Sequence, residues 1–424
     1  MRYTTFLHRT IWQTFGVRVF SIYLVLYFLF ISNFIAGNYY FEYAILKDIN
    51  QPSQFITTSL MTLVNKVFLR QPLPDWFYFM GDNYWGLVSA LTFMTLSVII
   101  AFVWTLIDKG RHFPSLYKYV QVFARYYLAF VLLGYGLEKV DYNQFATDPI
   151  SMLVRFGDND RYHAFRSFMG ISKSYKFFAG LIELIPFVLL LFRRTSTIGA
   201  MIALMVLTNV LILNIGYDIW LKLIIINLIL FCIFIIIPDI KRLYQIFFLK
   251  QSAGLKSVPA VIGDKRYKWL QHTSKFLLIG VVVCMQVSLE IRWYHQRVNG
   301  PYKELVGVYD VKEFLCFTNG FRNDVDSLKW QKFALNQFAE MDVFLRNDSL
   351  KWFYMSVDTS KKILDLKQGQ DTAIKGTLHY TNIQNGLWLF EGKLKNDSIR
   401  FISHRTDMYD MPVMKGYGKF AWLY

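Results

Sequence analysis

The sequence has few of the residues that build disulfide-rich or metal-binding domains. Of its 424 residues only three are cysteine, and Cys232, Cys284 and Cys316 lie far apart. This spacing excludes a disulfide framework, a C-x-x-C redox pair and a zinc ribbon. None of the seven histidines lies in the centre of an apolar run, which argues against a membrane haem held by two histidines. The sequence therefore predicts no metal site and no cofactor that the chain holds by a known motif.

Charged residues are also scarce, at 18% of the chain against the roughly 25% that is usual in globular proteins. Hydrophobic residues make up 54%, and the mean hydropathy is +0.29. The net charge of +16 comes mostly from residues 1–298, because residues 299–424 hold 17 Lys or Arg against 15 Asp or Glu. This balance is typical of a membrane protein with a nearly neutral soluble part. It argues against nucleic-acid binding, which would need a basic patch on that part.

Seven apolar runs are candidates to cross a hydrocarbon core of about 30 Å as helices. A signal peptide is the alternative for the first run, but its length favours a retained helix. The run at 276–291 is short for a span. A further stretch, 57–69, is too short and too polar to span and is expected to lie at the interface. The seven runs are 19–36, 85–107, 119–140, 174–192, 198–217, 218–237 and 276–291.

From Val306 onward the apolar pattern changes to period two. Eight short segments rich in β-branched and aromatic residues are separated by Gly, Asn and Asp. Two of the expected hairpins share an Asn-Asp-Ser turn, in LRNDSLKWF and LKNDSIRFI. We therefore predict an all-β domain, a small barrel or a sandwich.

The predicted architecture is a multi-pass α-helical membrane protein with a C-terminal β domain. The four parts are two N-terminal spanning helices with a loop at 1–116, a four-helix bundle at 117–243, a basic segment with the seventh helix at 244–298, and the β domain at 299–424.

The loop charges favour one topology. The N-terminus, 108–118, Arg193–Arg194 and 239–275 are rich in Lys and Arg, and they fall on one side if seven helices alternate. The positive-inside rule then predicts a bacterial inner-membrane protein with a cytoplasmic N-terminus and a periplasmic C-terminal domain.

Polar side chains near the outer ends of the bundle helices form the first candidate ligand-binding site. In the predicted topology acid, base and amide groups converge there, because polar groups among lipid-length helices are costly unless they face one another. Asp218 and Lys222 lie one helical turn apart and are expected to pair. The alternative is that the charged members snorkel to the interface. The candidates are Glu138, Lys139, Asn209, Asn214, Asp218 and Lys222.

Glu183 is the candidate catalytic residue, because an ionisable group near the membrane centre is a functional hypothesis by default. Pro186, close to it, frees a backbone carbonyl and can bend the helix. The alternative is a protonated carboxyl that bonds to Asn209 or to a backbone carbonyl. Tyr126, Tyr127 and Tyr135 are candidates to line a cavity for a planar ligand, although aromatic residues in spanning helices usually only pack.

The stretch from Trp104 to Leu243 resembles the DoxX-like integral membrane proteins, a bacterial four-helix family. The resemblance is carried by ARYYLAFVLLGYGLEKVDYNQF (124–145), FMGISKSYKFFAGLIELIPFVLLLFRRTSTIGA (168–200) and TNVLILNIGYDIWLKL (208–223). It implies a four-helix membrane bundle and, through the subunit after which the family is named, an association with thiosulfate:quinone oxidoreduction. It implies no catalytic residues.

Two functions remain open. In the first, the bundle binds a quinone or a lipid and acts with a periplasmic or membrane redox partner, with Glu183 handling the proton and Lys222 and Asn209 holding the headgroup. In the second, the protein is a non-enzymatic assembly or envelope-maintenance factor whose β domain binds a partner. The sequence shows no P-loop, G-x-S-x-G, H-E-x-x-H or dinucleotide fingerprint, so it leaves open whether the protein is an enzyme. A transporter is less favoured, because the seven runs show no inverted repeat.

Overall fold

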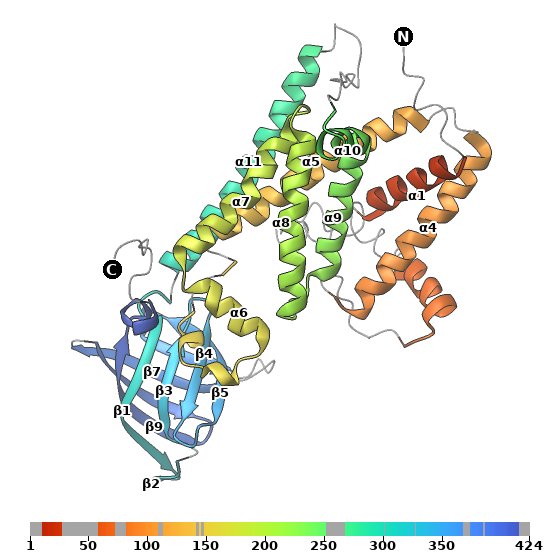
Figure 1. The fold of residues 1–424 in the computed structure, drawn as a ribbon. Coiled ribbons are helices and arrows are strands. Elements are labelled where there is room, and N and C mark those ends of the chain that lie inside the picture. The colour runs from red at the N-terminus through yellow and green to blue at the C-terminus, as the bar shows by residue number, and fades with distance from the viewer. Residues whose placement is uncertain are drawn as a thin grey trace. The chain divides into compact units, whose positions relative to one another are not determined.

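The computed structural model divides the chain into two compact units, each drawn in Figure 1. The membrane unit comprises Met1–Leu137 and Leu181–Val287, and the barrel unit comprises Glu138–Gly180 and Ser288–Tyr424. The structure therefore groups the loop after the first bundle helix with the β domain. The residues that the structure describes are 11–27, 58–72, 82–108, 113–140, 144–145, 148–251, 268–300, 302–326, 328–367, 374–384 and 386–414.

Six helices among the described residues are long and apolar enough to cross a membrane, which confirms the predicted helical membrane region. The last bundle helix continues past a 3₁₀ turn into a short amphipathic helix. The elements are α4 (Tyr84–Asp108), α5 (Phe113–Val140), α7 (Lys173–Leu191), α8 (Ser196–Gly216), α9 (Lys222–Ile236) with η6 (Ile237–Asp239) and α10 (Ile240–Phe247), and α11 (Lys268–Asn299).

The first and the last predicted spans differ from their expected bounds. Helix α1 covers Ile11–Tyr27, and the rest of the predicted span 19–36 lies outside the described residues. The run 276–291 was expected to be short, but it forms only the middle of α11, which has 32 residues. The apolar pattern marks only the apolar part of the helix, and more polar segments extend it at both ends.

The core of the membrane unit lies among α1, α4, α5, α7, α8 and α9. Small residues allow close helix packing at Gly199 and Ala203 of α8, both of which are buried. A Cβ atom at Gly199 would lie 2.9 Å from the Leu189 Cβ on α7, so a larger residue would push these two helices apart.

The stretch Thr58–Leu69 is helical, as predicted, and ends in the π-helical turn η3 (Asn65–Leu69). It packs through Met61 against Trp85 and Val88 of α4. The Tyr84 hydroxyl donates to the Asn65 side-chain oxygen at 2.5 Å, which fixes the polar residue that interrupts the apolar run.

The β domain is a closed antiparallel barrel, so of the two predicted forms the barrel is confirmed. Each strand pairs with the next along the barrel, and the first pairs with the last to close it. Strand β2 only extends one end of β1. The strands are β1 (Gly307–Thr318), β2 (Phe321–Arg322), β3 (Trp330–Leu335), β4 (Glu340–Leu345), β5 (Leu350–Asp358), β6 (Ile363–Lys367), β7 (Ile374–Gln384), β8 (Leu387–Leu394) and β9 (Asp397–Thr406).

Aromatic side chains fill the interior of the barrel. The rings of Tyr309 and Phe333 stack with centroids 4.5 Å apart, and Phe401 lies 5.1 Å from Phe390 and 4.9 Å from Trp330. Because side chains alternate along each strand, these residues point inward while their neighbours face out. The centre of the barrel is therefore a packed core.

The two predicted hairpins are present, but their turns differ. Between β4 and β5 the left-handed residue is Asp348, as the Asn-Asp-Ser pattern suggests. Between β8 and β9 the turn is Lys395–Asn396, and Lys395 takes the left-handed conformation with φ 56°. There the strand pairing extends to Asp397 opposite Leu394, which shortens the turn. The length of each turn thus depends on how far the two strands pair, and not on the Asn-Asp-Ser sequence that the two hairpins share.

Candidate functional site

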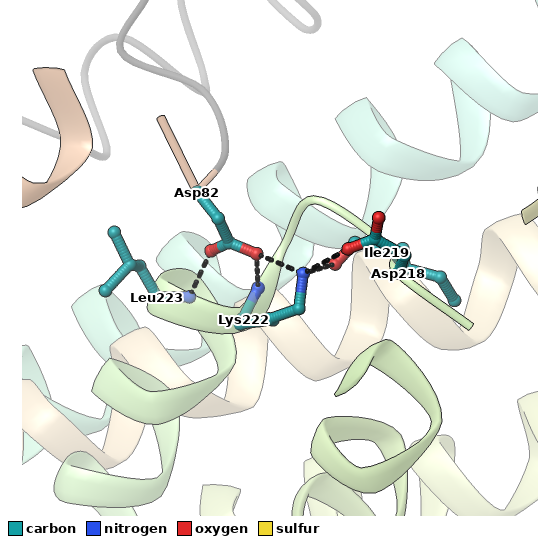
Figure 2. Close-up of polar contacts among 5 residues, drawn as sticks. All are labelled: Asp82, Asp218, Ile219, Lys222 and Leu223. Atoms are coloured by element: carbon teal, nitrogen blue, oxygen red, sulfur yellow. Dashed lines mark hydrogen bonds and ion pairs between the residues drawn. The ribbon is translucent and has the colours of Figure 1, made fainter. Parts of the chain in front are cut away.

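Lys222, at the start of α9, lies between two carboxylates (Figure 2). Its Nζ donates to Asp82 Oδ2 at 3.1 Å and to Asp218 Oδ1 at 3.3 Å. Asp82 also accepts from the backbone N–H groups of Lys222 at 3.0 Å and of Leu223 at 2.8 Å. An acidic side chain that accepts the free N–H groups of a helix N-terminus is a capping arrangement. The main role of this group is thus to fix the start of α9.

Asp218 has a second structural role in the turn between α8 and α9. Its backbone is left-handed, with φ 53°, which Asp tolerates better than most residues. The N–H of Ile219 donates to the Asn214 carbonyl at 2.9 Å and closes the end of α8. The predicted pair of Asp218 and Lys222 is present, and it belongs to this helix reversal.

The remaining amide candidates have different environments. Asn209 lies on an exposed face of α8, so the structure does not bring it into a group with Lys222 or Glu183. Asn214 is 4% exposed, and its side-chain Nδ2 has no hydrogen-bond partner among the described residues. Glu183 is 2% exposed in the middle of α7, so it faces the protein interior. Of these three residues, Asn214 and Glu183 are buried and Asn209 is exposed.

Glu138 and Lys139 belong to the barrel unit, and so does Lys176, near the start of α7. Lys139 is 7% exposed and Lys176 is fully buried. The Lys176 ammonium donates to the Phe145 carbonyl at 3.0 Å and so ties the loop after α5 to α7. Sequence reasoning missed Lys176 because a lysine at the start of a spanning helix usually snorkels to the interface.

A group of tyrosines forms a polar cluster in the core of the membrane unit. The Tyr23 hydroxyl donates to Asn227 Oδ1 at 2.8 Å, and Asn227 Nδ2 donates to the Leu223 carbonyl at 2.8 Å. Tyr27 stacks beside Tyr23, with ring centroids 6.4 Å apart. We call Tyr23, Tyr27, Tyr127, Tyr135 and Asn227 the tyrosine cluster; it draws on α1, α5 and α9.

Tyr27 is the unusual member of the tyrosine cluster. It is 2% exposed, and its hydroxyl has no hydrogen-bond partner among the described residues. It lies within electrostatic range of Tyr127 and Tyr135. A buried hydroxyl without a partner costs about 1–3 kcal/mol, so such a group needs an explanation. Within the part of the chain that the structure describes, the Tyr27 hydroxyl is therefore a buried donor without an acceptor.

Sequence reasoning found part of the tyrosine cluster. Tyr126, Tyr127 and Tyr135 were named as candidates to line a cavity, and two of them, Tyr127 and Tyr135, belong to the cluster. Tyr23 and Asn227 are 204 positions apart, so no local pattern indicates that they bond. A Tyr-x-x-x-Tyr spacing in the first apolar run, at Tyr23 and Tyr27, is the signal that could have pointed to it.

A second polar cluster, in the barrel unit, joins the loop after α5 to the outer face of β4. The Asn336 amide donates to Asp148 at 3.3 Å and to Glu340 at 2.7 Å. Burial raises the pKa of Asp148 above its usual value. Burial, and then the negative charges of Asp148 and Glu340, raise the pKa of Asp342 to about 6. The negative charges of the carboxylates repel one another. The positive charge of Arg166 lowers the pKa of Asp148 and so offsets part of this repulsion.

This cluster should make the stability of the barrel unit depend on pH. A carboxyl whose pKa is raised by folding stabilises the fold below its unfolded value, near 3.8, and this stability is lost as the pH rises through about 6. We expect Asp342→Asn to remove that loss and to stabilise the unit by about 1 kcal/mol at neutral pH, after discounting for solvent screening. Hydrogen exchange of β3 and β4 in the full chain, followed from pH 4 to 8, measures it.

The matched control is Asp310→Asn, because Asp310 is half-buried and its carboxylate pairs with Lys332 at 3.2 Å. We expect this change to alter the stability by less than about 0.5 kcal/mol at each pH. An Asp342→Asn variant with the same pH profile as the wild type would contradict the assignment.

Among the described residues no group of three or more His, Cys, Asp or Glu side chains could hold a metal ion. No family model matches the chain, and no solved structure matches it. The chain is similar to the uncharacterized protein YwoB of Bacillus subtilis (strain 168), with 28% identity over 138 residues. The similar region covers 88% of that protein and 32% of this chain, so the greater part of this chain lies outside it.

Proposed function

We propose that this protein is a DoxX-like protein of a bacterial inner membrane, with its N-terminus in the cytoplasm and its barrel unit in the periplasm. The charge of the loops supports this orientation, because Lys and Arg are concentrated in the segments that fall on the side of the N-terminus. The resemblance of residues 104–243 to the DoxX-like family supports a bundle with a membrane-embedded role.

In this proposal the bundle binds a small apolar molecule with a carbonyl oxygen, a quinone or a lipid ester. The observation that carries it is the buried Tyr27 hydroxyl, which has no partner among the described residues. A phenol donor among aromatic rings suits such a ligand, since the carbonyl accepts the hydrogen bond and the rings contact the planar or apolar body. Tyr23 cannot take this role, because its hydroxyl already bonds Asn227.

If the ligand is a quinone, it supplies the redox chemistry, and the electrons come from a partner protein. The chain would then bind and orient the ligand and exclude water from it. Glu183 is the proposed proton-handling residue, because its carboxyl is buried in a spanning helix. Lys222 no longer suits a headgroup donor, since Asp82 and Asp218 occupy its ammonium.

The test is mass spectrometry of the lipids and quinones that co-purify with the detergent-extracted full chain. We expect Tyr27→Phe to retain about tenfold less ligand, because one hydrogen bond of about 1.4 kcal/mol corresponds to a tenfold change in affinity. The thermal stability of the ligand-free protein should stay the same or rise, since the variant removes a hydroxyl that is buried without a partner. Tyr119→Phe is the control, because Tyr119 is 58% exposed on the same helix as Tyr127.

Equal retention of ligand by the wild type and by Tyr27→Phe would contradict the proposal. Together with a loss of stability in Glu183→Gln, it would favour the other function, in which the polar groups only lock the helices and the barrel unit binds a partner.

A further inference from the structure

The short helix α10 (Ile240–Phe247) is held in a fixed orientation at the end of α9. Leu243 packs against the core of the membrane unit. The Arg242 guanidinium bonds Asp239 at 3.1 Å, and the Thr197 hydroxyl donates to the other oxygen of Asp239 at 2.6 Å. Figure 1 shows α10 turned away from the axis of α9. One face of α10 is thus attached to the bundle. The opposite face points away from the bundle, and we call it the outer face.

The outer face of α10 is apolar and aromatic. Tyr244 is 55% exposed, and its ring stacks on that of Phe248 with centroids 5.3 Å apart. Ile240, Phe247 and Phe248 are also exposed. A short helix that presents aromatic and aliphatic side chains next to lysines is the pattern of segments that lie in the membrane interface.

The outer face contains a hollow with a volume of about 390 Å³. The chain reverses after α10, where Lys250 is left-handed with φ 51°. The N–H of Leu249 bonds the Tyr244 carbonyl at 3.3 Å, and the N–H of Gln251 bonds the Gln245 carbonyl at 3.1 Å. The Leu249 bond continues the last turn of the helix, so Leu249 stays against it before the chain reverses at Lys250. The residues that line the hollow are Ile240, Lys241, Tyr244, Gln245 and Leu249.

The charge of the hollow is positive. Lys241 is the ionisable cation of its lining, and the lining contains no carboxylate. The nearby Asp239 is already bonded to Arg242 and Thr197, so it does not neutralise Lys241. Lys250 adds a second exposed cation at the reversal. The hollow therefore combines an ammonium and an amide donor with an apolar wall.

We propose that this hollow binds the headgroup of an anionic phospholipid. Lys241 and Gln245 hold the phosphate, and Ile240, Tyr244 and Leu249 contact the start of the acyl chains. Basic residues beside an interfacial helix bind anionic lipid because each contributes about 1 kcal/mol near the charged surface. In the topology proposed above, α10 faces the cytoplasm. This site is separate from the tyrosine cluster and needs no ligand there.

The test uses the full chain in detergent, stripped of lipid and titrated with phosphatidylglycerol or phosphatidylcholine, with native mass spectrometry as the readout. We expect the wild type to retain phosphatidylglycerol about tenfold more strongly than phosphatidylcholine. Lys241→Gln should remove most of this preference, and Lys241→Arg should keep it. The control is Lys361→Gln, in the turn between β5 and β6, where the lysine side chain is 72% exposed.

Two results would overturn the proposal. The first is equal retention of the two lipids by the wild type. The second is displacement of phosphatidylglycerol by millimolar inorganic phosphate, which would assign the hollow to a free anion. The preference of Tyr27→Phe for phosphatidylglycerol over phosphatidylcholine should equal that of the wild type, because both lipids carry the ester carbonyl that Tyr27 would bind. A failure of the tyrosine cluster proposal therefore leaves this result unchanged.

Discussion

An Asp108→Ala variant is expected to lose about 3–5 kcal/mol of stability in the membrane unit, because it leaves a buried cation without its counter-ion. Arg18 is fully buried, and its Nη2 forms an ion pair with Asp108 at the end of α4. The other contacts of Arg18 are weaker. Its Nη1 donates to the Thr105 hydroxyl at 3.0 Å, and its guanidinium lies 5.4 Å from the Trp104 ring centre. Thermal unfolding of the full chain in detergent measures the loss.

The control for this prediction removes both charges. An Arg18→Met, Asp108→Leu double variant should recover most of the stability, because a buried ion pair is often replaceable by apolar side chains of similar volume. The prediction would fail if Asp108→Ala unfolded at the wild-type temperature, or if the double variant were no more stable than Asp108→Ala.

A Phe401→Ala variant should destabilise the barrel unit by a similar amount, about 3–5 kcal/mol, through the cavity that it leaves. Phe401 is 1% exposed and contacts four other aromatic rings inside the barrel. Since these rings also contact one another, no single neighbour can move to fill the space. Hydrogen exchange of β8 and β9 in the full chain should become faster by the corresponding factor.

The matched control is Trp352→Ala, on the outer face of β5. Trp352 is larger than Phe401 but 47% exposed, and its close aromatic neighbour is Tyr354 at 5.3 Å. We expect this change to cost less than about 1 kcal/mol. Equal losses in the two variants would mean that the interior of the barrel is not a packed core.

The elements of the fold could be predicted from the sequence because each has its own local signal. A helix such as α8 is long and apolar enough to cross a membrane, so its apolar length alone identifies it. A strand such as β4 alternates buried Met341 and Val343 with half-buried Asp342, and this period is visible in the residues. Barrel closure could not be predicted, since the pairing of β1 with β9 depends on the curvature of the whole sheet.

The candidate site was harder to predict because its contacts join distant segments. Lys222 was predicted to pair with Asp218, four residues away, and it does. Its other partner, Asp82, is 140 positions away. The Asp82 carboxylate also accepts the first backbone N–H groups of α9 and so caps that helix. Asn209 lies on an exposed face of α8, and the sequence could not predict this because α8 is apolar around most of its circumference.

The pairing of β1 with β9 has a consequence for how the protein is made. Val308 lies opposite Thr406 and Thr318 opposite Asp397, so the seam is complete only when nearly the whole domain has left the ribosome. Until then β1 and β8 are unpaired edges, which other chains can join. During synthesis the domain therefore exposes two strand edges that can aggregate with other chains. Pairing of β9 with β1 and β8 removes both edges.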